Sequence, residues 1–104
     1  MGEAKLKARQ IDGLLDAHGD ACARFETSIT ILDPDQPWRS VEDKVCAMTL
    51  LMVVAEITRV GEVEAARSGY AIYVRDGGAV LTVWLPRARA SEVRADVLAG
   101  RRPQ

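Results

Sequence analysis

Eleven consecutive residues near the middle of the chain, from Val45 to Ala55, carry no charge and are almost all apolar. The stretch reads VCAMTLLMVVA, and in a helix it would be apolar around its whole circumference. It is too short to span a bilayer, which needs about 20 residues. A helix without a polar face must be covered on all sides. We therefore expect this helix at the centre of the fold, with part of its cover supplied by a second copy of the chain.

Two elements are predicted before this stretch. Apolar residues at three- and four-residue steps predict an amphipathic helix from Glu3 to about Arg24. Gly13 and Gly19 each weaken it by about 1 kcal/mol relative to alanine, which leaves open whether it ends near Gly19. The segment Phe25–Leu32 alternates polar and apolar side chains and is rich in β-branched residues, which predicts a strand with one solvated face. Two prolines within residues 33–39 predict an irregular connection.

The central helix is expected to begin after Ser40. The Ser40 hydroxyl can accept a hydrogen bond from the amide of Asp43, while that carboxylate reaches back in a capping-box arrangement. The helix should end at Gly61, a residue that suits a C-cap, and Glu62–Arg67 is expected to add a further short turn. A last short helix is predicted near Ser91–Ala99.

The stretch Tyr70–Leu85 reads as a β-hairpin around a glycine pair. A two-residue turn, either Asp76-Gly77 or Gly77-Gly78, places even positions of the first strand on the same face as odd positions of the second. A three-residue loop would send much of the apolar set outward, so burial favours the two-residue turn. The apolar face then comprises Tyr70, Ile72, Val74, Leu81, Val83 and Leu85.

The predicted order is helix, strand, helix, β-hairpin, helix. Because a lone hairpin is marginal in water, the strand at Phe25–Leu32 is expected to pair with it. The sequence therefore predicts a single α+β domain over residues 1–104, with helices packed on one face of a small, mainly antiparallel sheet. Residues 100–104 are expected to form a frayed tail.

The second face of the hairpin carries the residue types that are enriched at binding hot spots, namely tyrosine, tryptophan and arginine. We therefore expect Tyr73, Arg75, Thr82 and Trp84 to form a partner-binding surface. The alternative is that a helix of the same chain covers this face, because a tyrosine hydroxyl and an indole N–H tolerate burial when they are hydrogen-bonded.

No set of residues typical of a catalytic acid, base or nucleophile is recognisable, and the chain has one histidine and no asparagine. The sequence therefore predicts an accessory or regulatory protein that acts through protein–protein binding, as a homodimer and without a cofactor. The alternative is a small-molecule-binding or enzymatic domain, with a pocket between the sheet and the central helix. The residues expected to line that pocket are Met48, Met52, Tyr73 and Trp84.

Two smaller groups of side chains could bind a metal ion, but each has a simpler explanation. His18, Cys22 and Cys46 are of the types that hold zinc, yet a histidine and a cysteine on an apolar stripe are more often packed core residues. Asp33 and Asp35 stand beside prolines, which is typical of a turn. The sequence therefore predicts no metal site.

Charge and the first residues of the chain restrict the partner and the compartment. A net charge of -1 at pH 7 gives no overall field for nucleic acid or an anionic membrane. The arginines after position 86 have no aromatic residues between them, as in a solvated helix face. The N-terminal sequence has no apolar signal core, and two cysteines in apolar sequence fit reduced thiols. We expect a cytoplasmic protein that binds neither nucleic acid nor membrane.

Overall fold

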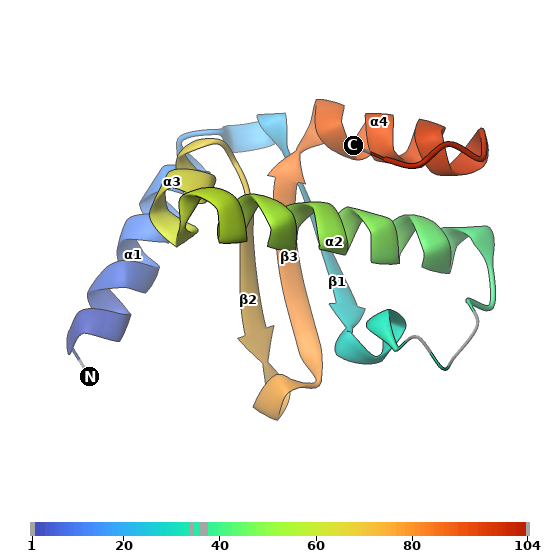
Figure 1. The fold of residues 1–104 in the computed structure, drawn as a ribbon. Helices are drawn as coiled ribbons and strands as arrows, with labels where there is room; N and C mark the ends of the chain where they lie inside the picture. The colour runs from blue at the N-terminus through green and yellow to red at the C-terminus, as the bar shows by residue number, and fades with distance from the viewer. Residues whose placement is uncertain (1, 34, 36–37, 104) are drawn as a thin grey trace.

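Three strands form one antiparallel sheet, and four helices pack around it, in the computed structural model of residues 2–33, 35 and 38–103 (Figure 1). The strand order is β1-β3-β2, so β3 is central and the other two strands are edges. The α+β class and the antiparallel sheet predicted from the sequence are confirmed. The elements are α1 (Gly2–Asp16), β1 (Cys22–Ser28), α2 (Val41–Val60), α3 (Glu62–Arg67), β2 (Ala71–Arg75), β3 (Val80–Pro86) and α4 (Arg87–Leu98).

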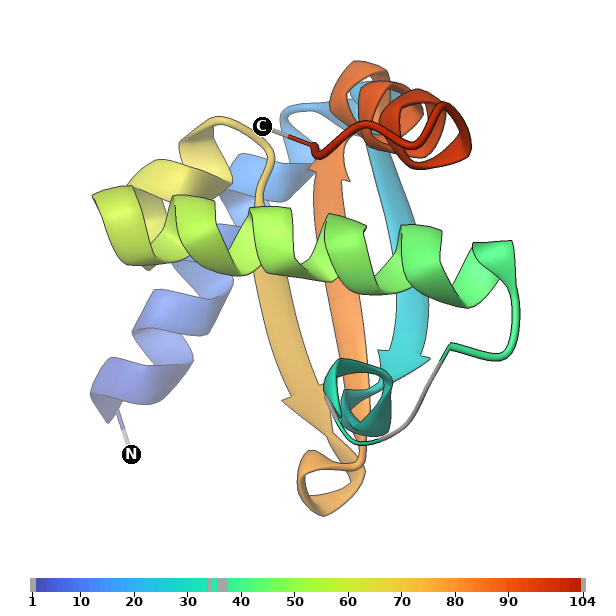
Figure 2. The same ribbon diagram turned by 45° about the vertical axis from the view of Figure 1, so that its right-hand side comes forward.

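The apolar helix α2 crosses one face of the sheet (Figures 1 and 2). Its outer side is not fully covered, because Leu51 and Val54 are 46% and 40% exposed. No helix in the described part of the chain is both long and apolar enough to cross a membrane. The buried core between α2 and β3 comprises Leu50, Val53, Leu81, Val83 and Leu85.

The two ends of α2 form as expected. Ser40 Oγ accepts a hydrogen bond from the Asp43 amide at 3.2 Å, and the Asp43 carboxylate accepts one from the Arg39 amide at 3.3 Å. At the other end Gly61 has a φ of 89° and donates its N–H to Ile57 O. The short helix α3 follows directly.

The β2–β3 hairpin has the register of a Gly77-Gly78 turn. Ile72 pairs with Val83, and the last paired residues are Arg75 and Val80, so residues 76–79 make the connection. An even number of connecting residues keeps the parity of the two-residue turn. Ile72, Leu81, Val83 and Leu85 therefore share the α2 face, whereas Val74, near the hairpin end, is 63% exposed.

The first helix is shorter than the sequence pattern indicates. It ends at Asp16, and a 3₁₀ turn over Gly19–Ala21 leads into β1 at Cys22. Gly19 has a φ of 54°, a conformation that ends a helix and that residues with side chains rarely adopt. Cys22, which the helical spacing of apolar residues would include, is instead the first residue of β1.

The first strand also ends earlier than predicted, at Ser28. The Ser28 hydroxyl accepts a hydrogen bond from the Thr30 amide at 3.3 Å, and Ile29–Leu32 forms a 3₁₀ turn. A serine that bonds to nearby backbone competes with strand pairing. After this turn, residues 33, 35, 38 and 39 belong to no helix or strand, as expected, and residues 34, 36 and 37 lie outside the described part.

The last helix, α4, begins at Arg87, four positions before the predicted start at Ser91. Pro86 precedes it with a φ of -57°, which is already suitable for entry into a helix. Val93 and Val97 on α4 are buried against Val45 of α2. Residues 101–103 form no helix or strand, and residue 104 of the expected frayed tail lies outside the described range.

The first helix, α1, packs against the second face of the sheet, near its β2 edge (Figure 2). Ile11 and Leu15 of α1 are buried against Ala71 at the start of β2, with Tyr73 and Trp84 at the border of this cluster. The small side chain of Ala71 leaves room for the helix. In addition to the cover that α2 gives, the sheet is thus partly covered on its other side.

Candidate functional site

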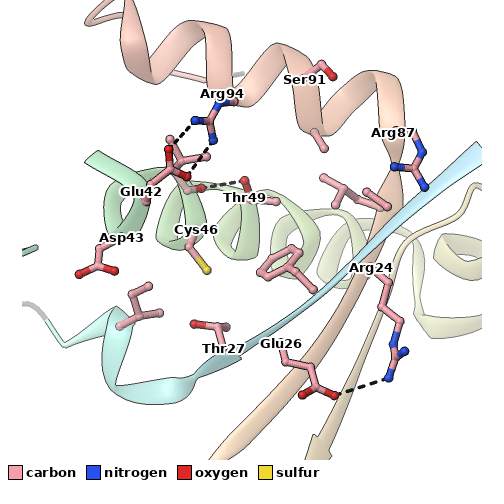
Figure 3. Close-up of a pocket in the computed structure, with 16 residues that line it drawn as sticks. Arg24, Glu26, Thr27, Glu42, Asp43, Cys46, Thr49, Arg87, Ser91 and Arg94 are labelled. Atoms are coloured by element: carbon pink, nitrogen blue, oxygen red, sulfur yellow. Dashed lines mark hydrogen bonds and ion pairs between the residues drawn. The ribbon is translucent and has the colours of Figure 1, made fainter. Parts of the chain in front are cut away.

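A groove of about 620 Å³ runs along β1, between that strand, α2 and α4 (Figure 3). The five successive β1 residues at positions 23–27 line it. Because successive side chains of a strand point to opposite faces, a cavity that meets all five must follow the edge of the strand. The edge of β1 that faces away from β3 has no strand neighbour among the residues described. The groove therefore lies along an open sheet edge.

The floor of the groove is mainly apolar. Phe25, Val45 and Leu85 contribute to it from β1, α2 and β3. Thr49 also lines it, but its hydroxyl donates to Val45 O at 2.7 Å and is satisfied within α2. The site thus offers a surface for apolar side chains, with few free polar groups at its base.

Cys46 points into the groove beside Thr27 (Figure 3). Burial raises the pKa of the Cys46 thiol, and this effect outweighs the opposing one of a hydrogen bond with Thr27. A thiol with a raised pKa is protonated at neutral pH and is a poor nucleophile. Cys46 therefore acts as a small apolar lining group.

An ion pair joins the two helices that form the upper rim of the groove (Figure 3). Arg94 of α4 donates to both carboxylate oxygens of Glu42 on α2, one of them at 2.8 Å. The hydrogen bond with Arg94 holds the pKa of Glu42 below its usual range. The charges of these two side chains neutralise each other.

The two ends of the groove carry opposite charges that have no such partner. At one end Arg87 donates to two backbone oxygens, Asp20 O at 2.9 Å and Cys22 O at 3.1 Å. At the other end the Asp43 carboxylate accepts from the Arg39 amide. Neither Arg87 nor Asp43 forms an ion pair within the described part of the chain.

The predicted partner-binding residues share the face opposite α2, and α1 lies over its aromatic part. The rings of Tyr73 and Trp84 pack edge-on, with their centroids 5.1 Å apart. The Tyr73 hydroxyl donates a hydrogen bond of 2.5 Å to a carboxylate oxygen of Asp12 on α1. Burial, and then the bond to Asp12, raise the pKa of Tyr73. Thr82 is 2% exposed, and its hydroxyl has no hydrogen-bond partner within the residues described. Arg75 is exposed and pairs with Glu26 of β1.

The residues of the alternative pocket are not brought together. Met48 and Met52 lie between α2 and α4, beside the Val45 and Val93 cluster. Tyr73 and Trp84 belong to the α1 cluster on the other side of the sheet. The sheet therefore separates the two methionines from the two aromatic residues.

The residues weighed for zinc binding are also apart. His18 Nε2 is hydrogen-bonded to Arg67 O at 3.0 Å, and Cys22 Sγ donates to Gly69 O at 3.6 Å. Cys46 lies in the β1 groove instead. Within the described ranges, no group of three or more His, Cys, Asp or Glu side chains could hold a metal ion.

Sequence reasoning did not find the β1 groove. Its walls come from Thr27, Cys46 and Ser91, which belong to three elements and form no motif. The one available signal was that a third strand added to a hairpin must leave one of its own edges unpaired.

Compared with protein-family models, curated proteins and solved structures, the chain matches none.

Proposed function

We propose that this protein is a protein-binding module that takes up an extended segment of a partner beside β1. The observation that carries the proposal is the open edge of β1 next to an apolar floor between α2 and α4. An edge strand has backbone N–H and C=O groups with which an added strand can pair, and adjoining pockets select its side chains. By binding a segment of a partner in this way, the protein would act as an accessory or regulatory protein. The two cysteines of the protein are free thiols, which are typical of proteins in the reducing cytoplasm.

The dimensions of the groove support a peptide as the ligand. At about 3.3 Å per residue, the five lining positions of β1 span roughly 16 Å, the length of a short extended segment. A small molecule would need several polar groups that converge on it. Here the Thr49 hydroxyl is already bonded within α2, and the Cys46 thiol is protonated. The supporting observations therefore favour a chain over a small metabolite.

A variant that fills the groove tests the proposal. Ser91 is exposed on α4 and lines the groove, whereas Ala95 is exposed on the same helix and does not line it. Immobilised protein would be exposed to a lysate of the source cell and cross-linked, and the attached chains would be mapped by mass spectrometry. We expect Ser91→Trp to lose partners that the wild type and the control Ala95→Trp retain, with cross-links at β1. Equal capture by a folded Ser91→Trp variant would contradict the proposal.

We further propose that the protein forms a homodimer through the outer side of α2. Leu51 and Val54 are exposed there, and no charged residue occurs between Lys44 and Glu56. Val54 also lines a second groove, of about 560 Å³, between α1, α2 and β2. A second copy would cover this apolar surface by packing the same helix against it.

Light scattering after size exclusion tests the homodimer. At high micromolar concentration we expect the mass of two chains for the wild type and of one chain for Leu51→Glu. As a control with the same change of charge, Ala95→Glu should remain dimeric. A one-chain mass for the wild type would contradict self-association and leave the β1 groove proposal intact.

A further inference from the structure

We infer that the β1 groove selects the direction of the segment that it binds: an acidic side chain or a terminal carboxylate lies at the Arg87 end, and a basic side chain lies at the Asp43 end. This inference rests on the proposed function and adds to it the chemistry and orientation of the partner.

The cationic end is built around a fixed arginine. The guanidinium of Arg87 is held by the backbone oxygens of Asp20 and Cys22. An arginine has five N–H donors, so three remain after these two bonds. No carboxylate of the described chain uses them. Arginine and a carboxylate form short, charge-assisted hydrogen bonds, so a carboxylate is the group that this end suits best.

The other end of the groove is lined by two carboxylates and one guanidinium, those of Glu42, Asp43 and Arg94. Glu42 is neutralised by Arg94, whereas among the described residues the Asp43 carboxylate accepts a hydrogen bond only from the Arg39 amide. The hydrogen bond from that amide is 3.3 Å long, and Asp43 lies at the start of α2, where it lines the groove (Figure 3). A lysine or arginine of the partner would supply the missing positive charge.

The positions of the two charges along β1 set the direction. Arg87 contacts the carbonyl of Cys22, where β1 begins, and Asp43 belongs to the α2 turn next to Cys46, which faces Thr27 near the end of the strand. A segment that runs antiparallel to β1 would place its carboxyl end at Arg87 and its amino end at Asp43. Antiparallel addition also continues the pairing of the existing sheet. The expected partner segment is basic first, apolar in the middle and acidic last.

Two peptides of identical composition test the inference. One has lysine at the amino end and glutamate at the carboxyl end, with valine and threonine alternating between them. The second has the reverse order, and both have blocked termini. Titration of each into isotope-labelled protein, followed by NMR, gives the affinity and the β1 amides that shift. A third peptide, with a free terminal carboxylate in place of the glutamate, separates a chain end from an acidic side chain.

We expect the lysine-first peptide to bind about tenfold more tightly than its reverse, from the two end charges together, and the difference to shrink in high salt. Arg87→Gln should abolish the preference, and Arg102→Gln, which removes the same charge from the exposed tail, should preserve it. Equal affinities with shifts at β1 would overturn the inference and leave the proposed function standing. An absence of β1 shifts with every peptide at millimolar concentration would overturn both.

Discussion

Gly69 lies directly against the thiol of Cys22, because a Cβ atom added at Gly69 would be 2.7 Å from Cys22 Sγ. The same thiol donates to the Gly69 carbonyl at 3.6 Å. This contact joins the start of β1 to the approach to β2, across 47 positions of the chain. Gly69 also has a φ of 89°, where a side chain is strained.

Gly69→Ala is therefore expected to lower the free energy of unfolding by about 2–4 kcal/mol, from backbone strain together with overpacking. Gly13 is the matched control, since it lies in α1 with open space around its Cα. Gly13→Ala should raise the free energy of unfolding by about 0.5–1 kcal/mol. Urea denaturation of both variants measures these changes. Similar stabilities for the two variants would contradict the prediction, because they would show that the Cys22 side chain moves aside at little cost in free energy.

Leu50 and Leu51 are neighbours on α2 with opposite environments, the first fully buried and the second 46% exposed. Leu50→Ala should lower the free energy of unfolding by about 2–5 kcal/mol, because it removes buried methyl groups and leaves a cavity. Leu51→Ala should change the stability of a single chain by less than about 1 kcal/mol. Thermal and urea unfolding at low protein concentration compare them. A large loss in Leu51→Ala under these conditions would contradict the exposure of its side chain.

The ion pair between Glu42 and Arg94 predicts that the free energy of unfolding depends on pH in the acid range. Since the hydrogen bond to Arg94 lowers the pKa of Glu42 in the folded state, the pair stabilises the fold above the unfolded pKa. This contribution is lost as the pH falls through the lower, folded value. An NMR titration of the Glu42 carboxyl should give a lower pKa in the wild type than in Arg94→Gln. Identical titration curves would mean that the pair does not form in solution.

The two cysteines should react with iodoacetamide at different rates. Burial raises the pKa of both thiols, but Cys22 is buried and Cys46 is half-buried in the groove. We expect slow alkylation of Cys46 at neutral pH, faster alkylation as the pH rises, and still slower reaction at Cys22. Peptide mapping by mass spectrometry measures each site, with Cys46→Ser as the control. Faster modification of Cys22 would contradict the placement of the two thiols.

The hairpin register could be predicted because its evidence is local. Only an even connection buries Ile72 together with Val83, and the glycine pair marks where that connection lies. The cap at Ser40 is equally local, since the hydroxyl and the Asp43 amide are three residues apart. Short-range geometry and burial were sufficient for these elements.

The placement of α1 and the groove could not be predicted in this way. The alternation of Phe25–Leu32 suggests a strand, but it does not show that pairing begins at Cys22 or that a serine ends it. Nothing in the sequence around Tyr73 indicates that Asp12, 61 positions away, accepts its hydroxyl hydrogen. Both features depend on contacts between distant segments, and a local pattern contains no information on them.

The position of β1 in the sheet also has a consequence for the order of folding. β2 and β3 pair across a four-residue connection, whereas Cys22 of β1 pairs with Pro86, 64 positions later. Closing a long loop costs more chain entropy than closing a short one, so contacts distant in sequence form slowly. We expect β1 to join last and to detach first, which would uncover Leu81 and Val83. A segment seated beside β1 would hold the last strand in place and so slow the unfolding of the whole sheet.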